Sequence, residues 1–321
     1  MALIVWLASI NVLAQDGGVS LKPILKPGQE ARYSLSGSVE TQITPAGANG
    51  IGGAERRELS ATVLLRAGVP ATLLTDSQTL QKLGSPVTGN TVAGMGLPYS
   101  SERYIYQSNT QSKDVVYYEA VIEALDARAT VNGLESPLNV KGVVGQKIGF
   151  TLDAAGYIVR CVAPTEAARA GLIDLLFSML SWSPAQPSAV GQTWGTPAGS
   201  DQPGYGYVSA AAMSSVPKSA QTAYTFKALD GGRAVVEGAI TLRQPGASML
   251  EMPAARVKVN LIASGGGTTR VEYDVTSNRI ASAASESTLK GRVVNIPPTR
   301  EGEKMQPREG ALVETAKFSI R

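Results

Sequence analysis

Histidine is absent from this 321-residue chain. Histidine is the commonest general base at neutral pH and the commonest zinc ligand, so its absence excludes Ser-His-Asp and Cys-His catalysis. The only cysteine is Cys161, which leaves a transition-metal site almost nothing to bind with. Neither a glycine-rich nucleotide motif nor a calcium loop of alternating aspartates is present. We therefore expect a protein that is not an enzyme and that uses no metal and no cofactor.

Charged and aromatic residues are also scarce, at 17% and 6% of the chain. The net charge of +3 is small and its charges are scattered, which argues against a nucleic-acid partner. The three tryptophans are too few for a carbohydrate platform built from several exposed rings. Glycine (34 residues) and proline (18 residues) are frequent, a balance that is typical of a turn-rich β protein.

The leading segment, "MALIVWLASINVLAQDGG", is apolar and uncharged from residue 2 to residue 14. It is shorter than the about 20 apolar residues that a transmembrane helix needs, and its length suits the apolar region of a secretory signal. Small residues precede the polar stretch that begins at Gln15, so we predict a signal peptide, residues 1–14, that is cleaved after about Ala14. No basic residue precedes Lys22, which a start codon further upstream would explain. A buried N-terminal strand or helix is the alternative.

The number and position of cysteines indicate in which cellular compartment the protein is located. Cys161 cannot form an internal disulfide, and an exported protein without disulfides is typical of a bacterial periplasm or cell surface. No cysteine follows the leading apolar run, which argues against a lipid anchor. We predict a periplasmic or extracellular protein without a transmembrane span. Cys161 lies in the strand-like "YIVRCVAP" and is expected to be a buried core residue rather than a nucleophile.

Alternation with a period of two dominates the rest of the chain. In "EARYSLSGSVETQI", residues 30–43, apolar side chains alternate with polar ones, which indicates a strand with one buried face. The same alternation recurs at 59–65, 234–242, 257–263 and 269–275. Sequences rich in glycine and asparagine predict hairpin turns at 131–134, 152–156, 229–233 and 264–268. Strands joined by short hairpins pair antiparallel.

Two segments are less regular. Residues 44–56, which include "GANGIGGAE", are expected to form a flexible loop. Residues 115–129, "VVYYEAVIEALDARA", fit a helical face by spacing but a strand by their β-branched and aromatic content. We predict a strand there because both flanking segments have β character.

One segment predicts a helix, at about residues 166–182, within "APTEAARAGLIDLLFSMLSWSP". Thr165 is a suitable N-cap and Pro184 prevents continuation. Apolar side chains surround most of this helix and leave a narrow polar stripe of Asp174, Ser178 and Ser181. Such a helix has to be covered on several sides. It is either an ordinary core helix packed on a sheet or a plug over an apolar cavity.

An internal echo suggests two related halves. Glycine-glutamine pairs occur in "GQEARY" (28–33), "GQKIGF" (145–150) and "GQTW" (191–194), and "TLDAAGYI" is similar to "EYDVTSNRI". A duplication would produce these echoes, and so would chance in a glycine-rich chain. The predicted division is an N-terminal β half (15–164), a central apolar helix (165–184) and a C-terminal β half (185–321).

Catalytic groups that do not need histidine are few. "STLK" at 287–290 and "SVPK" at 215–218 have the spacing of a Ser-Lys dyad, but neither opens a predicted helix. Glu119 and Glu123 are a carboxylate pair on one predicted strand. A hydrolase working through such groups is therefore the least favoured of three functional hypotheses.

The strand starts "PGQEARYSLSGSVETQ", "VGQKIGFTLDAAGYIV" and "VGQTW", together with the apolar helix, resemble secreted proteins of the LolA/LppX type. These are periplasmic lipoprotein or lipid carriers in which a curved antiparallel sheet wraps a helix or cavity. The resemblance covers about a tenth of the chain and implies an apolar ligand by analogy only. No residue of known role is carried over from it.

The predicted fold is mainly β, a large curved antiparallel sheet or two related half-barrels wrapped around the apolar helix. The favoured function is a non-enzymatic exported protein that binds a lipid, a lipid-modified polypeptide or another apolar ligand. The alternative is a structural or protein-interaction module of the cell envelope with a fully packed core, which has another envelope protein as its partner. Plain core packing explains the candidate ligand-lining residues better than contact with a ligand does. These residues are Leu172, Leu176, Phe177, Met179, Tyr33 and Leu35.

Overall fold

The computed structural model describes residues 18–22, 25–68, 87–88, 103–107, 115–138, 140, 142–153, 158–180, 182–184, 186–195, 216, 218–243, 249–252, 254–255, 257–295 and 306–321. The predicted signal peptide therefore lies outside the described residues. Fifteen strands form one sheet, antiparallel except for the short β3–β4 pair, which confirms the predicted fold class. The strands are β1 Glu30–Pro45, β2 Gly53–Ala67, β3 Val87–Thr88, β4 Arg103–Gln107, β5 Val115–Val131, β6 Leu134–Pro137, β7 Lys147–Asp153, β8 Ile158–Pro164, β9 Thr193–Gly195, β10 Ser219–Asp230, β11 Arg233–Arg243, β12 Met249–Met252, β13 Val257–Asp274, β14 Arg279–Asn295 and β15 Arg308–Ile320.

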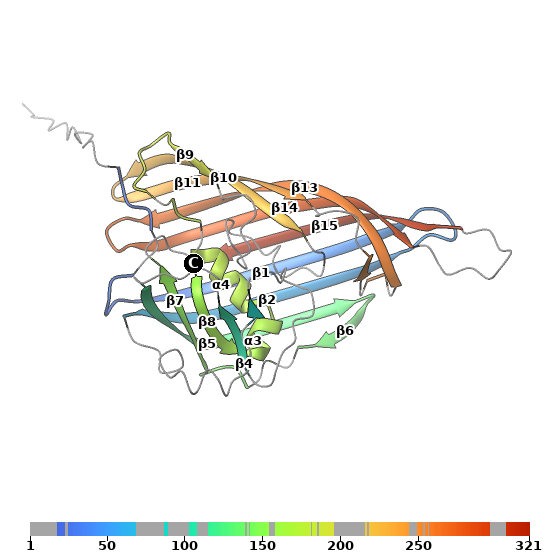
Figure 1. Cartoon of the computed structure of the whole chain (residues 1–321), viewed down its shortest axis with the longest axis horizontal. Coiled ribbons are helices and arrows are strands. Elements are labelled where there is room, and N and C mark those ends of the chain that lie inside the picture. Colours follow the sequence, from blue (N-terminus) through green and yellow to red (C-terminus); the bar gives the residue numbers. More distant parts are fainter. Residues whose placement is uncertain are drawn as a thin grey trace, which may run out of the picture.

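The sheet joins two five-stranded meanders through one shared strand (Figure 1). The first meander runs β1, β2, β5, β7, β8, and the second runs β9, β10, β11, β13, β14, each in chain order. Strand β15 pairs with β14 of the second meander on one side and with β1 of the first on the other. The two halves therefore share one continuous hydrogen-bonded sheet. That they arose by duplication stays a prediction.

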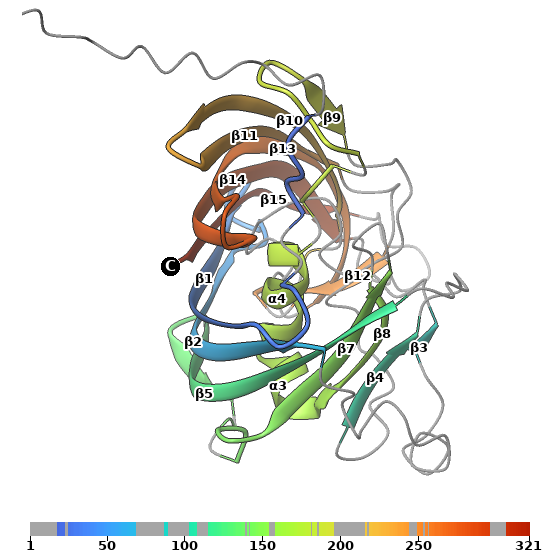
Figure 2. The ribbon, with the colours of Figure 1, turned by 90° about the vertical axis from the view of Figure 1, so that its left-hand side faces the viewer.

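Alternation of side chains gives the sheet a dry concave face and a wet convex face. In β1, the residues from Ala31 to Ile43 that point inward are buried while most of their neighbours are exposed. Strands β11 and β15 show the same alternation. In Figure 2 the sheet curves around helix α4 (Leu172–Leu180), so the buried side chains face the helix. The period of two read from the sequence thus defines which face forms the core.

Two of the four predicted turns are confirmed and one is wrong. Asn132 and Gly133 connect β5 to β6 with φ values of 51° and 80°, and Gly231 and Gly232 connect β10 to β11. The 152–156 turn falls largely on residues that the structure does not describe, between the paired strands β7 and β8. The predicted turn at 264–268 lies instead inside β13, which is paired with β11 and β14 on its two sides.

The glycines of residues 264–268 have a structural role other than forming a turn. A Cβ atom at Gly267 would lie 2.1 Å from the carbonyl oxygen of Glu286 on β14. Glycine there allows neighbouring backbones to approach closely where the 18-residue strand β13 follows the curvature of the sheet. The glycines of residues 264–268 therefore mark a close approach between neighbouring strands and not a turn.

The predictions for the two less regular segments, 115–129 and 44–56, have different outcomes. Residues 115–129 are part of strand β5, as predicted. The loop expected at 44–56 is shorter than predicted, because β1 extends to Pro45 and β2 begins at Gly53.

The predicted helix at 166–182 is two helices, α3 (Thr165–Arg169) and α4. Gly171 between them has φ of 90°, a left-handed conformation that ends α3 and turns the chain before α4. Thr165 is not the N-cap: the cap position is occupied by Pro164, and no side chain caps the helix.

The three glycine-glutamine echoes are three copies of one turn. Gly28, Gly145 and Gly191 have φ values of 84°, 84° and 91°. In each turn the following glutamine donates its backbone N–H to the carbonyl three residues earlier, which is the hydrogen bond of a type II β-turn. The side chains of Gln29 and Gln192 also accept the N–H of that earlier residue, both at 2.8 Å. The echo thus encodes a recurrent entry into a strand.

Candidate ligand site on the concave face

The scarce aromatic residues gather at one end of the concave face. All four phenylalanines and five of the larger aromatic side chains belong to one buried cluster. Four of its aromatic pairs stack or meet edge to face, among them Tyr118 with Phe150 at 5.2 Å and Trp182 with Tyr273 at 5.9 Å between ring centroids. The aromatic cluster, as we call it, consists of Tyr33, Tyr118, Phe150, Phe177, Trp182, Tyr224, Phe226, Tyr273 and Phe318, with Trp194 packed against it.

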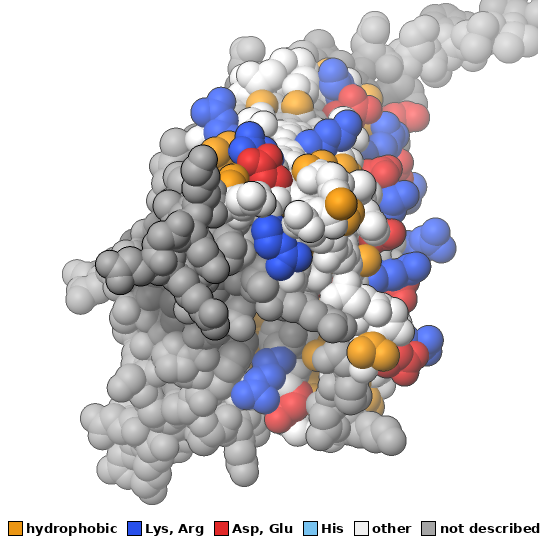
Figure 3. Space-filling model, turned by 90° about the vertical axis from the view of Figure 1, so that its right-hand side faces the viewer, with side chains coloured by type: hydrophobic (Ala, Val, Ile, Leu, Met, Phe, Trp, Pro, Cys, Tyr) orange, Lys and Arg blue, Asp and Glu red, His pale blue; other side chains and the backbone are white. Residues whose placement is uncertain are grey.

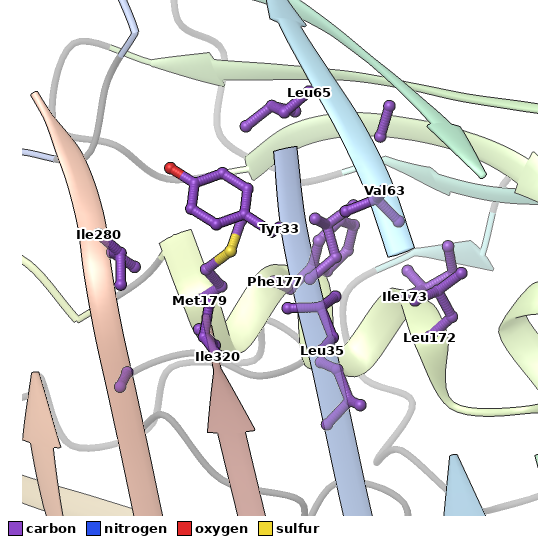
Figure 4. Packing of buried hydrophobic residues seen from close by; sticks show 14 of the residues in the cluster. Tyr33, Leu35, Val63, Leu65, Leu172, Ile173, Phe177, Met179, Ile280 and Ile320 are labelled. Atoms are coloured by element: carbon purple, nitrogen blue, oxygen red, sulfur yellow. The ribbon is translucent and has the colours of Figure 1, made fainter. Parts of the chain in front are cut away.

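All six predicted ligand-lining residues belong to the same buried cluster of hydrophobic residues as these aromatic side chains. Four come from α4 and two from β1. Figure 4 shows Phe177 and Met179 of α4 pointing toward Tyr33 and Leu35 of β1. Each of the six is at most 4% exposed. They pack against one another, and their contact with a ligand stays a prediction.

A segment near the N-terminus crosses the concave side at this end, shown in dark blue in Figure 2. We call residues 18–22 and 25–28 the strap. Val19 forms a β-bridge with Ser188, which precedes β9. Leu21 and Leu25 of the strap are 0% and 2% exposed and belong to the same buried cluster as the aromatic side chains. The strap was not predicted from the sequence, because its apolar residues and lysines alternate irregularly.

Two tyrosines from opposite halves hold the strap. The hydroxyl of Tyr273 on β13 donates to the carbonyl oxygen of Lys22 at 2.5 Å. The hydroxyl of Tyr118 on β5 donates to the carbonyl oxygen of Leu25 at 3.3 Å. The strap is thus fastened to both meanders by phenolic hydrogen bonds to its backbone.

Burial shifts the acidity of these phenols. Burial raises the pKa of Tyr33 to about 12, while a backbone hydrogen bond from Ile280 acts in the opposite direction. Burial also raises the pKa values of Tyr118 and Tyr273, and the neighbouring tyrosines add to both shifts. All three phenols are therefore protonated at physiological pH, and those of Tyr118 and Tyr273 act as hydrogen-bond donors.

Trp182, directly after α4, adds another donor. It is 1% exposed, and its Nε1 atom has no hydrogen-bond partner among the described residues. Its carbonyl oxygen accepts a hydrogen bond from Trp194 Nε1 at 3.0 Å. The aromatic end of the concave face thus combines apolar rings with a few directed N–H and O–H groups, which is the usual chemistry of a small-molecule pocket.

A second buried cluster lies on the concave face beyond the aromatic one. It is purely aliphatic and consists of Ile43, Ile51, Val216, Ile240, Leu242, Ala254, Val259, Leu261, Ala263, Leu289, Val293 and Leu312. Val216 reaches it from the segment before β10. Asn132 Nδ2 donates to the carbonyl oxygen of Ala254 at 3.1 Å, which ties this end of the second meander to the β5–β6 turn of the first.

Between the two clusters the concave face is polar. Lys218, just before β10, forms an ion pair with Glu314 of β15, and their side chains are 3% and 2% exposed. Thr41 of β1 donates to the other oxygen of Glu314 at 3.3 Å. Next to Thr41 on β2, Glu55 pairs with Arg57 at 2.7 Å. We call these five residues the polar belt.

The groups considered for hydrolysis do not converge. Ser287 is buried on the concave face while Lys290 is exposed, because residues three apart in a strand point to opposite faces. Ser215 of the other motif lies outside the described residues. Glu119 pairs with Lys147 at 3.0 Å, and Glu123 forms a bidentate pair with Arg32 at 2.7 and 2.8 Å. Arg32 holds the pKa of Glu123 below its usual value.

Cys161 is fully buried in β8, and burial raises the pKa of its thiol far above the usual range. A thiol in such surroundings is inert as a nucleophile. Within the part of the chain that the structure describes, no group of three acidic or cysteine side chains could hold a metal ion. Among the same residues, no helix is long and apolar enough to cross a membrane.

Among the residues that the structure describes, the convex face carries ion pairs. Arg270 pairs with Glu237 at 3.2 Å and with Glu272 at 3.3 Å, and Lys317 pairs with Glu286 at 3.2 Å. These pairs flank a groove of about 740 Å³ across β10, β11, β13 and β14. On the side of the molecule seen in Figure 3, acidic and basic side chains are interspersed and hydrophobic atoms form small separate spots.

Comparison with known proteins gives no family. No family model and no curated protein matches the chain. Among solved structures it is similar to lipovitellin, in a structure concerned with lipid–protein interactions, with a TM-score of 0.41 and 10% identity over 92% of this chain. The chain spans only 25% of that lipovitellin chain.

It is also similar to the toluene transporter TodX of Pseudomonas putida, with a TM-score of 0.14 and 9% identity over 92% of this chain and 89% of that chain. A mutant of the TodX monoaromatic hydrocarbon channel gives a TM-score of 0.16. Likenesses at these scores carry no argument for function. Membership of the LolA/LppX type stays a prediction.

Proposed function

We propose that this protein is a non-enzymatic, exported carrier of an apolar ligand such as a lipid or a lipid-modified polypeptide. The ligand binds at the aromatic cluster, between α4 and the concave face of the sheet. It enters and leaves when the strap opens. The protein acts in the periplasm or outside the cell, after removal of residues 1–14.

The observation that carries this proposal is the way the strap covers the aromatic cluster. A strand or helix at this position would be held by a continuous hydrogen-bonded ladder or by a broad packed face. The strap is held by one β-bridge, two phenolic hydrogen bonds, the hydrogen bond from the N–H of Gly28 to the carbonyl oxygen of Ala67 at 2.9 Å, and the buried side chains of Leu21 and Leu25. Each hydrogen bond contributes about 0.5–1.5 kcal/mol and each leucine about 1.5–3 kcal/mol. Local opening therefore costs less than unfolding of the sheet.

The first experiment asks whether a ligand is bound. The protein is produced in a bacterium with its leader, purified without detergent, extracted with organic solvent and analysed by mass spectrometry. We expect a stoichiometric lipid or other apolar molecule and an N-terminus at about Gln15. An extract that matches a denatured and refolded control would contradict the carrier function.

The second experiment locks the strap. Val19 and Ser188 exchange backbone hydrogen bonds at 2.8 and 2.9 Å, so their Cα atoms are about 5.5 Å apart, which suits a disulfide. Val19→Cys with Ser188→Cys is made in a Cys161→Ala background. We expect the oxidised protein to exchange the uncharged fluorophore N-phenyl-1-naphthylamine at least tenfold more slowly than the reduced protein.

A matched disulfide controls for general stiffening. Ser36 and Ser319 face each other on the convex side of β1 and β15, with their hydroxyls 2.8 Å apart. A disulfide at these two positions leaves the strap untouched and should not change the exchange rate. Equal exchange in the oxidised and reduced strap variants would rule out entry beneath the strap.

A protein-interaction module of the cell envelope is the second candidate, and complete burial of the six predicted lining residues favours it. A protein whose interior is filled has to bind its protein partner through an exposed apolar surface. The exposed large hydrophobic residues that the structure describes lie on separate elements, with Ile262, Leu134 and Val190 the most exposed. An empty extract together with capture of an envelope protein would select this function.

A further inference from the structure

The polar belt adjoins a stretch of small side chains on the concave face, centred on Ser285 and Ser287, which we call the small-residue patch. Ser287 of β14 is 2% exposed and points inward. Its register partners on either side are Gly267 of β13 and Ala316 of β15, so neither neighbour extends beyond Cβ. Ser285, the next inward residue of β14, is 7% exposed. Small side chains thus replace the large apolar ones that occupy both ends of the face.

The two hydroxyls of the small-residue patch have no hydrogen-bond partner among the residues that the structure describes. The Oγ atoms of Ser287 and Ser285 are both buried and have no hydrogen-bond partner among the described residues. A buried hydroxyl without a partner costs about 1–3 kcal/mol. Native structures rarely keep such groups without a reason, and binding of a polar ligand is one. The small-residue patch can therefore form further hydrogen bonds.

The charges beside the small-residue patch are already balanced. Glu314 lies beside Leu289 in the β14–β15 register, so it is the next inward position along β15 from Ala316, the register partner of Ser287. Lys218 and Thr41 contact its two carboxylate oxygens. An added anion would meet a carboxylate, and an added cation would meet an ammonium group. Either would be buried without a counter-charge, at a cost of several kcal/mol.

We propose that the small-residue patch binds the polar end of an amphipathic ligand, and that it selects an uncharged hydroxyl- or ester-bearing headgroup over an ionised carboxylate. Ser287 and Ser285 hydrogen-bond the headgroup, and the Lys218–Glu314 pair excludes charged ones. The acyl chain then extends along the concave face toward the aromatic cluster. This inference rests on the proposed carrier function and specifies its ligand class.

The test compares three probes on the full mature protein: 1-monooleoylglycerol, oleate and N-phenyl-1-naphthylamine, at pH 8. We expect the monoacylglycerol to bind at least tenfold more tightly than oleate, which has the same chain. Equal or tighter binding of oleate overturns the headgroup assignment while leaving the carrier function intact. If none of the three probes binds, the carrier function fails and this inference fails with it.

Variants of Ser287 locate the headgroup. Ser287→Ala should weaken monoacylglycerol binding about three- to tenfold, the effect of one hydrogen bond, and leave binding of the fluorophore unchanged. Ser287→Thr keeps the hydroxyl and should retain most of the affinity. Ser264→Ala, at an exposed position of β13, is the matched control. An equal loss for the fluorophore and the monoacylglycerol would overturn the proposal, since it would indicate a general packing effect.

Glu314→Gln provides a second, independent readout. It leaves the ammonium group of Lys218 without its carboxylate partner, so an anionic headgroup can take that place. We expect oleate to gain at least tenfold in affinity relative to monooleoylglycerol. Unchanged selectivity in a variant that keeps its far-ultraviolet circular dichroism would overturn the role assigned to the ion pair.

Discussion

Asp174 is the residue at which simple helix patterning and the structure disagree most. The sequence places it on the narrow polar stripe of an otherwise apolar helix, with Ser178 one turn later. In the structure Ser178 is 0% exposed and donates to the carbonyl oxygen of Asp174 at 2.8 Å. Burial raises the pKa of Asp174 to about 7. Ser178 is therefore fully covered and Asp174 is half-buried, so this part of the stripe is largely removed from solvent.

This burial predicts how stability depends on pH. An aspartate in the unfolded chain has a pKa near 3.9, so between about pH 4 and pH 7 only the folded state holds the Asp174 proton. The contribution of this group to stability therefore falls as pH rises through that window and levels off above it. Asp174→Asn should stabilise the protein by about 1–3 kcal/mol at pH 8 and change little at pH 4. Urea unfolding at the two pH values measures the difference.

Asp126 provides the control for this measurement. Its side chain is 63% exposed and pairs with Arg128 at the surface. Asp126→Asn should leave the difference between pH 4 and pH 8 as it is in the unmodified protein. An Asp174→Asn variant that is equally stable relative to the parent at both pH values would show that Asp174 is ionised at low cost in the fold.

At the scale of elements, the break between α3 and α4 depends on Gly171. Its φ of 90° is costly for any residue with a Cβ atom, by about 1–3 kcal/mol. Gly171→Ala should therefore lower the free energy of unfolding by that amount, either through strain or by forcing one straight helix. Gly142→Ala is the matched control, because no atom lies within 4 Å of its added Cβ and its φ is not positive. Chemical denaturation compares the two, and equal stability would refute the role of Gly171.

The elements that the sequence predicts well are those whose signal is repeated along the chain. Alternation over 30–43 and the central part of 115–129 identifies β1 and β5 because many residues contribute to each pattern. Single-residue signals are less reliable. The glycines of 264–268 support either a turn or a close backbone approach, and only pairing with β11 and β14 decides between them.

The candidate site likewise has one part that the sequence predicts and another that it does not. The residues of α4 and β1 were found because they are apolar and periodic, and the structure unites them in one cluster. The strap and the polar belt were missed because both depend on long-range contacts. Tyr118 and Leu25 are 93 residues apart, and Lys218 and Glu314 are 96 residues apart. No local pattern in the sequence indicates such pairs.

At the scale of the whole molecule, strand β15 makes one folding unit of two meanders. Its residues from Gly310 to Ile320 pair with β1, and those from Arg308 to Ile320 pair with β14. Neither meander can lose this strand without exposing an unpaired edge, which promotes aggregation. The strap and the Asn132–Ala254 hydrogen bond connect the same two halves at other places.

We therefore predict that the two halves unfold together, although a chain of this length often unfolds in stages. Transitions followed by tryptophan fluorescence, which reports Trp182 and Trp194 outside β15, and by far-ultraviolet circular dichroism should have the same midpoint. Thr315→Pro removes a backbone donor at a position that pairs with Glu40 on one side and Thr288 on the other. It should lower both midpoints equally, whereas Thr315→Val should leave them in place. Separate midpoints, or a proline effect on circular dichroism alone, would mean that the meanders are independent and that a strap joining them cannot be coupled to the sheet as a whole.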